Sequence, residues 1–181
     1  MTIDQARRIW NASSGFDELM YNITGCDDKE RIRTAVLEDY DKPEFAKRLF
    51  DFTVVSLMRA RLAEKGSALV TNANREILSL DTASMLDSPI DACFDHVQTI
   101  DDWPHRKPDP RVFDRVLGLL GVSSTDTVYI GDEIKDYEAA RSAGMLFIGV
   151  ETGMSTREEF KERGAFSVST LPDALDVLKL G

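Results

Sequence analysis

The chain has 181 residues, enough for one domain with a buried core and a small appendage. Its net charge of −10 argues against nucleic acid or an anionic membrane as a partner, because phosphate-rich partners are bound through an excess of lysine and arginine. Cys26 and Cys93 lie far apart and lack Cys-x-x-Cys spacing, so the cysteines predict neither a zinc site nor a disulfide framework.

Neither a targeting segment nor a membrane segment is predicted. Residues 1–10 include Asp4, Arg7 and Arg8 and lack the apolar run of a secretory signal. No run of apolar residues is long enough to cross a bilayer. We therefore expect a cytoplasmic protein.

The N-terminal part of the chain, residues 1–65, carries apolar side chains at helical spacing. The spacing recurs in four groups: Ile3, Ala6, Ile9 and Trp10; Phe16, Leu19 and Met20; Ile32, Val36 and Leu37; and Phe45, Leu49 and Phe52. No clear run of alternating strand residues interrupts them. This part is predicted to be a helical region, separate from the rest of the chain.

Residues 66–181 show a different pattern, in which short apolar runs alternate with helical periods. Such alternation is typical of βαβ units, so an α/β fold with a parallel sheet flanked by helices is predicted. The predicted strands are Ala68–Val70, Phe94–Ile100, Thr127–Ile130, Leu146–Val150 and Phe166–Val168. The helical N-terminal part is expected to form a layer over the carboxyl edge of this sheet.

Two of the predicted helices have recognisable ends. Asp109 before Pro110 opens one helix, and Gly121 closes it. Another helix is expected to begin at a capping box formed by Ser155 and Glu158.

An acidic turn follows the third predicted strand. Gly131 ends the strand, Asp132 and Glu133 come directly after it, and Asp136 follows four residues after Asp132. Ligands bind at the carboxyl ends of strands in open α/β sheets, and clustered carboxylates are the ligands that Mg²⁺ prefers. The alternative is that Asp132 only caps the helix that follows, since aspartate is a good N-cap.

Polar residues also follow the first two predicted strands. Thr71 and Asn72 come after Ala68–Val70, and Lys107 comes after the second strand. Taken singly, Thr71 and Asn72 suit an ordinary turn, and Lys107 suits a solvated charge before a helix. In a parallel sheet, however, these ends share one edge with the acidic turn. A hydroxyl, an ammonium and carboxylates meeting there suit a phosphoryl group and its metal ion.

Three segments carry a resemblance to a known family: Lys107-Pro-Asp-Pro110, Gly131-Asp-Glu-Ile-Lys-Asp-Tyr-Glu-Ala-Ala140, and Ala143-Gly-Met145. Residues 66–178 resemble the haloacid dehalogenase-like (HAD) superfamily, in the subgroup of phosphoglycolate phosphatase-like and β-phosphoglucomutase-like enzymes. The resemblance implies a Rossmann-like core, with residues 1–65 as the helical cap that governs substrate choice. It also implies a Mg²⁺-dependent phosphatase for a small phosphorylated metabolite.

The same resemblance implies a role for each matching residue. Thr71 would bind a phosphoryl oxygen beside Asn72, and Lys107 would stabilise charge on the nucleophile and the phosphoryl group. Asp132 would be the Mg²⁺ ligand, with Asp136 and Glu133 as supporting carboxylates.

The family's first motif, an apolar strand ending in Asp-x-Asp-x-Thr, does not precede the helical part of this chain. In the family, the first aspartate of that motif attacks phosphorus, and covalent catalysis cannot proceed without a nucleophile. We therefore expect a core whose first strand is missing and a hydrolase that is weak or inactive. The missing strand is also expected to leave two strand edges that pair with a second copy of the chain, exchange strands, or are filled from within.

Asp51 is an alternative nucleophile. It lies in Lys47–Ser56, which matches part of the first motif and has Thr53 two residues further on. Helical spacing of Phe45, Leu49 and Phe52 predicts a helix here instead. Two function classes thus remain, a HAD-type phosphatase and a non-catalytic binding or assembly module built on a degenerate HAD fold.

Overall fold

A computed structural model divides the chain into two compact units, Met1–Arg48 and Leu49–Gly181. In the second unit the structure describes residues 66–83 and 89–179. In the first it describes Gln5, Tyr21, Asn22, residues 24–28, Glu30, Arg31 and Thr34. Residues 49–65, which include Asp51, lie outside the described part. The structure therefore does not test Asp51 or the boundary predicted after residue 65. Both therefore remain predictions.

Gln5 is helical, and the other described residues of the first unit belong to a helical stretch before Gly25, the turn that follows it and a helical stretch after that turn. The first stretch ends at Gly25, whose N–H donates to the carbonyl oxygen of Tyr21 at 2.8 Å with φ at +67°, a left-handed conformation that glycine adopts at little cost. The second begins after Asp28, whose side chain accepts from the N–H of Arg31 at 3.0 Å. The apolar residues whose spacing predicts helices in this part of the chain lie outside the described residues, so that prediction stays untested.

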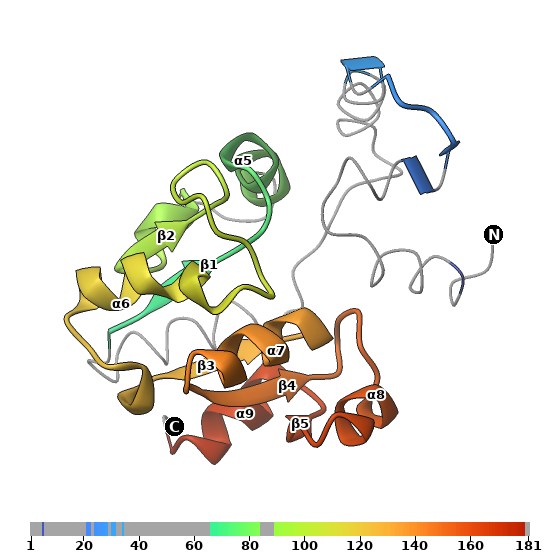
Figure 1. Ribbon diagram of the computed structural model, residues 1–181. Coiled ribbons are helices and arrows are strands. Elements are labelled where there is room, and N and C mark those ends of the chain that lie inside the picture. The colour runs from blue at the N-terminus through green and yellow to red at the C-terminus, as the bar shows by residue number, and fades with distance from the viewer. Residues whose placement is uncertain are drawn as a thin grey trace. The chain divides into compact units, whose positions relative to one another are not determined.

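The second unit contains five described strands, and all their pairings are parallel (Figure 1). They are β1 (Ala68–Val70), β2 (His96–Gln98), β3 (Val128–Gly131), β4 (Leu146–Val150) and β5 (Ser167–Val168). Each overlaps the run predicted for it. The predicted α/β fold with parallel strands is thus confirmed.

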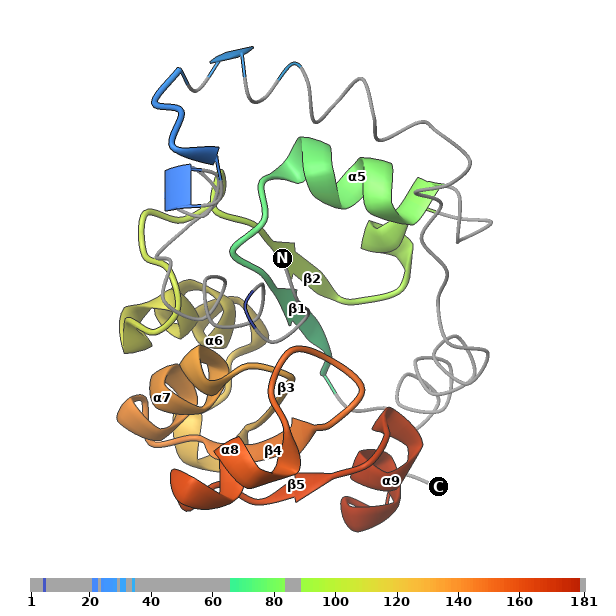
Figure 2. The same cartoon turned by 90° about the vertical axis from the view of Figure 1, so that its right-hand side faces the viewer.

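Helices connect the strands and cover both faces of the sheet. They are α5 (Arg75–Ala83), α6 (Asp114–Leu120), α7 (Ile134–Ser142), α8 (Arg157–Glu162) and α9 (Leu171–Val177), with 3₁₀ segments η2 (Ile90–Ala92), η3 (Pro110–Phe113) and η4 (Ser124–Asp126). Figure 2 shows α6 and α7 on one side of the strands and α9 on the other. Helices on both faces explain why β1, β3 and β4 are apolar along most of their length rather than alternating.

The helix predicted to begin at Asp109 and Pro110 and to end at Gly121 begins and ends at those residues. Asp109 accepts from the N–H of Arg111 at 2.9 Å, and Gly121 ends the helix in the left-handed conformation with φ at +66°. Its first turn is the 3₁₀ segment η3, and the α-helical part α6 follows directly.

The capping box predicted at Ser155 and Glu158 is wrong by one residue. The N-cap of α8 is Thr156, whose hydroxyl accepts from the N–H of Glu159 at 3.3 Å, while the Glu159 carboxylate accepts from the N–H of Thr156 at 2.7 Å. Ser155 is instead 1% exposed, and its hydroxyl accepts from the N–H of Ile134 at 3.2 Å. A contact with a distant helix therefore decides the register of the cap.

The core joins η3, α6 and α7 to the strands. Its buried members are Val70, Val112, Phe113, Val116, Ala139, Ala140 and Met145. The ring of Phe113, 1% exposed, meets the ring of Tyr129 edge to face at 4.9 Å. Fully burying a side chain such as Phe113 stabilises the fold by roughly 1.5–3 kcal/mol. This packing holds α6 and α7 against β1 and β3, and the short turn from Gly131 to Ile134 places the start of α7 at the carboxyl end of β3.

The strands form two ladders rather than one continuous sheet. One contains β1 and β2, and the other has the order β3–β4–β5. In the part of the chain that the structure describes, no backbone pairing joins β1 to β3. The family resemblance implies a first strand between the strands that end at Val70 and Ile130, which is the position of this gap.

Candidate functional site

The turn after β1 and the loop containing Lys107 are tied together by Asn72. Its side-chain oxygen accepts from the N–H of Lys107 at 3.0 Å, and its amide nitrogen donates to the carbonyl oxygen of Lys107 at 3.0 Å. Beside it, the Thr71 hydroxyl oxygen accepts from the N–H of Ala73 at 3.1 Å. Asn72 thus holds the Lys107 backbone, and in the described region the hydroxyl proton of Thr71 has no acceptor.

The side chain of Lys107 is 9% exposed, and its ammonium has three partners. Nζ lies 2.7 Å from Oδ1 of Asp136, 2.8 Å from the hydroxyl of Tyr129 and 3.3 Å from the carbonyl oxygen of Val70. Burial by itself lowers the pKa of Lys107, but Tyr129 and Asp136 outweigh burial and raise that pKa above its ordinary value. Lys107 is therefore a fixed positive charge rather than the solvated lysine of the alternative interpretation.

Asp136 lies in the first turn of α7 and is 2% exposed. Its Oδ2 accepts from the N–H groups of Asp132 and Glu133, each at 3.1 Å. Its Oδ1 faces the Lys107 ammonium, and no other described group donates to that oxygen. Both oxygens of Asp136 are thus engaged, one with the start of the helix and one with Lys107.

Asp132 is held by the loop between β4 and α8. Its Oδ2 accepts from the N–H of Met154 at 2.9 Å, and its carbonyl oxygen accepts from the N–H of Ser155 at 2.9 Å. Burial and the nearby charge of Asp136 raise the pKa of Asp132, and the hydrogen bond from Met154 opposes this rise only in part. Asp132 is not the N-cap of α7, because that position belongs to Glu133.

Glu133 turns toward its own helix. Its Oε2 lies 2.6 Å from Nζ of Lys135, and its backbone N–H donates to Asp136. In the described ranges, no three histidine, cysteine, aspartate or glutamate side chains come together as a metal-binding group. Asp132, Glu133 and Asp136 are therefore neighbours in the turn without forming a three-carboxylate cage.

The charges at this edge still suit a cation. Asp132 and Asp136 are two carboxylates, and the Lys107 ammonium neutralises one of them. The hydrogen bond from the Met154 N–H engages Oδ2 of the Asp132 carboxylate. Mg²⁺ keeps several waters and needs few protein carboxylates, so this donor set fits a weakly held ion.

Tyr129 is a site residue that the sequence interpretation missed. Its hydroxyl donates to the carbonyl oxygen of Val70 at 3.0 Å and accepts from Lys107, so it bridges β3 and β1. Burial raises the pKa of Tyr129 to about 12, with Lys107 opposing the rise, so the hydroxyl stays protonated at neutral pH. A tyrosine two residues before Gly131, at the end of a buried strand, is the signal that could have identified it, because a buried tyrosine needs a partner for its hydroxyl.

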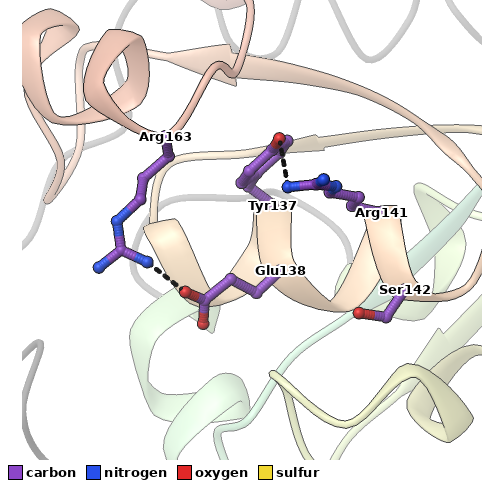
Figure 3. Close-up of a pocket in the computed structure, with 5 residues that line it drawn as sticks. All are labelled: Tyr137, Glu138, Arg141, Ser142 and Arg163. Atoms are coloured by element: carbon purple, nitrogen blue, oxygen red, sulfur yellow. Dashed lines mark hydrogen bonds and ion pairs between the residues drawn. The ribbon is translucent and has the colours of Figure 1, made fainter.

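A pocket of about 290 Å³ lies elsewhere, on α7 (Figure 3). Tyr137, Glu138, Arg141 and Ser142 line it together with Arg163, which pairs with Glu138 at 2.6 Å. None of the predicted site residues lines this pocket. This pocket is therefore separate from the predicted site at the carboxyl ends of the strands.

Within the described ranges, no helix has the length and apolar character needed to span a membrane.

Comparisons with known proteins agree on one family. A family model described as haloacid dehalogenase-like hydrolase matches residues 11–150. A glyceraldehyde 3-phosphate phosphatase from Methanocaldococcus jannaschii is 23% identical over 170 residues, which cover 93% of this chain and 73% of that protein. Pyrophosphatase PpaX from Bacillus velezensis is 39% identical over 61 residues, which cover 34% of this chain and 28% of that protein.

Solved structures share the fold. CbbY from Rhodobacter sphaeroides, in complex with phosphate, matches with a TM-score of 0.75 and 19% identity, over 93% of this chain and 78% of that chain. At this identity the likeness concerns the fold alone.

Proposed function

The chain belongs to the haloacid dehalogenase-like hydrolase family, and from this premise we propose that residues 66–181 form the phosphoryl-binding body of a phosphatase for small phosphorylated metabolites. The observation that carries the proposal is the buried Lys107 ammonium at the carboxyl ends of β1 and β3. A fixed positive charge in a site of low polarity stabilises negative phosphoryl oxygens far more than a solvated lysine does.

Each residue at this edge then has a role. The Thr71 hydroxyl donates its proton to a phosphoryl oxygen, and Lys107 neutralises charge on the group. Asn72 acts through Lys107, because its side-chain oxygen and nitrogen both hydrogen-bond the Lys107 backbone. This arrangement orients a phosphoryl group without forming a bond to it.

Asp132 is the proposed ligand for Mg²⁺, with Asp136 and Glu133 supporting it through water. When bound, the ion supplies positive charge to the phosphoryl oxygens. The fit rests on the two carboxylates Asp132 and Asp136, of which the Lys107 ammonium neutralises one. Because the described residues offer so few carboxylate ligands, we expect millimolar rather than micromolar affinity.

The proposal includes weak or absent turnover for the chain by itself. Among the described residues, Asp136 is engaged by Lys107 and two amides, and the proposal assigns Asp132 to the metal ion, so neither carboxylate is assigned as the nucleophile. Asp51 remains the alternative nucleophile, outside the described residues. Positioning without a nucleophile leaves only a small fraction of the catalysis that a complete site provides.

Hydrolysis of a generic aryl phosphate with and without Mg²⁺ tests this function. We expect a rate at or near background for the chain. If robust Mg²⁺-dependent hydrolysis appears and Asp51→Asn abolishes it, Asp51 is the nucleophile. If activity survives Asp51→Asn but falls with Asp132→Asn, water activated at the metal attacks phosphorus, and the proposed mechanism is wrong.

One observation favours the second function, a non-catalytic binding module. An ammonium has three N–H donors, and Lys107 already has three acceptors in Val70, Tyr129 and Asp136. A phosphoryl oxygen must therefore replace one of them. Calorimetry with inorganic phosphate separates the two functions: binding that Lys107→Met abolishes supports the phosphoryl site, and unchanged binding rejects it.

A further inference from the structure

The segment Gly153-Met154-Ser155 makes several independent contacts with the turn that carries Asp132. Met154 donates its N–H to the Asp132 carboxylate at 2.9 Å, and Ser155 donates its N–H to the Asp132 carbonyl oxygen at 2.9 Å. The Ser155 hydroxyl, 1% exposed, accepts from the N–H of Ile134 at 3.2 Å. The segment thus holds the side chain, the backbone and the following residue of one short turn.

Gly153 makes a closer approach than any other residue type allows. A Cβ atom built at Gly153 would overlap the carboxylate and Cβ of Asp132. The Asp132 side chain therefore occupies the space that a side chain at position 153 would fill. Because the atoms it would meet include the Asp132 Cβ as well as the flexible end, a larger residue there requires Asp132 to move.

We propose that Gly153, Met154 and Ser155 are positioning residues that set the orientation of the Asp132 carboxylate. They hold Oδ2 through the Met154 N–H and leave Oδ1 to face a divalent cation. This inference rests on the proposed role of Asp132 as the metal ligand. Groups that orient a metal ligand through hydrogen bonds typically change metal affinity by about 10- to 100-fold when they are lost.

Gly153→Ala is the variant that tests the positioning, and Gly149→Ala is its matched control. Gly149 lies in β4, and a Cβ there would overlap the Phe160 ring at 2.9 Å, so both substitutions introduce a clash of one methyl group. Only the first displaces Asp132. Calorimetric titration of the full chain with Mn²⁺ or Mg²⁺ should show a loss of about tenfold or more for Gly153→Ala and unchanged affinity for Gly149→Ala.

Hydrogen exchange of the Met154 amide gives a second readout that needs no metal. We expect faster exchange in Gly153→Ala and unchanged exchange in Gly149→Ala, because the Asp132 carboxylate protects that amide. Ser155→Ala adds no atoms and removes the hydroxyl contact with α7, so it serves if Gly153→Ala fails to fold. Its metal affinity should fall in the same direction.

Several results would overturn the inference. Unchanged metal affinity in Gly153→Ala or in Ser155→Ala would do so, as would retained protection of the Met154 amide in Gly153→Ala. An equal loss of affinity in Gly149→Ala would mean that the effect is general destabilisation. Asp132→Asn separates this failure from that of the proposed function: if it leaves metal binding unchanged, Asp132 is not the ligand and both proposals fall.

Discussion

The hydroxyl of Tyr129 donates to the carbonyl oxygen of Val70 at 3.0 Å, across the gap between two parallel ladders. The same hydroxyl accepts from Lys107, whose ammonium also reaches Val70 at 3.3 Å. Side chains therefore join β1 to β3 where the described backbone does not. The two groups that bridge the gap also belong to the proposed site, so stability and function are coupled there.

Removing this hydroxyl should weaken the fold. Tyr129→Phe removes the donor to the Val70 carbonyl oxygen and an acceptor for the Lys107 ammonium. This loss should lower the free energy of unfolding by about 1–3 kcal/mol. Tyr137→Phe is the control, because among the described residues its hydroxyl meets Arg141 alone, at 3.5 Å, and the change should alter stability by under about 0.5 kcal/mol. Urea unfolding of the two variants measures the difference. Equal values would mean that the Tyr129 bridge contributes nothing.

The buried ion pair of Lys107 and Asp136 should be costly to break. Asp136→Asn leaves the Lys107 ammonium buried without its neutralising charge, and such a loss typically costs about 3–5 kcal/mol. Glu138→Gln breaks the exposed pair with Arg163 instead and should cost no more than about 1 kcal/mol. Chemical unfolding of both variants at neutral pH tests the contrast. A cost for Asp136→Asn as small as that of Glu138→Gln would contradict the assigned charge state of Lys107.

The raised pKa of Asp132 predicts a pH-dependent loss of stability. Because the folded state binds this proton more tightly than the unfolded state does, the contribution of Asp132 is fully present below its ordinary pKa of 3.8. It is lost as pH rises from 3.8 through the higher pKa of the folded state. Asp132→Asn lacks this titration, so it should gain stability relative to the parent chain across that window.

Unfolding of both proteins over a pH series, in the presence of a chelator, tests this prediction. Asparagine keeps an acceptor for the Met154 N–H, so the comparison isolates the charge. A difference between the two proteins that stays constant with pH would show that the Asp132 pKa is not raised by folding.

Asn72 should control the Lys107 loop. Asn72→Ala removes two hydrogen bonds to the Lys107 backbone and should cost about 1–3 kcal/mol, with faster exchange of the Lys107 amide. Asn74→Ala is the control, since Asn74 accepts from the N–H of Ile77 at the start of α5, and it should cost about 1 kcal/mol. Exchange at Lys107 should not change in the control. The same exchange rate in both variants would mean that Asn72 does not hold this loop.

The sequence by itself predicted the parallel strands, the helix between Pro110 and Gly121, and the residue types gathered at the strand ends. These features depend on local spacing: a buried strand is a short apolar run, and glycine after a helix supplies the left-handed cap. The family motifs likewise lie in contiguous segments around Lys107 and Asp132. Their residues could therefore be found without knowing which segments meet in space.

Only the tertiary structure decided how those residues are used. Tyr129 reaches Val70 across 59 positions of sequence, and Met154 reaches Asp132 across 22. Such contacts have no local spacing rule, because they arise when separate elements pack on a common core. The same reason explains the misplaced capping box. The Ser155 hydroxyl accepts from the N–H of Ile134, and Thr156 is the N-cap of α8 instead. Long-range packing thus determined which donors and acceptors stayed free at the site.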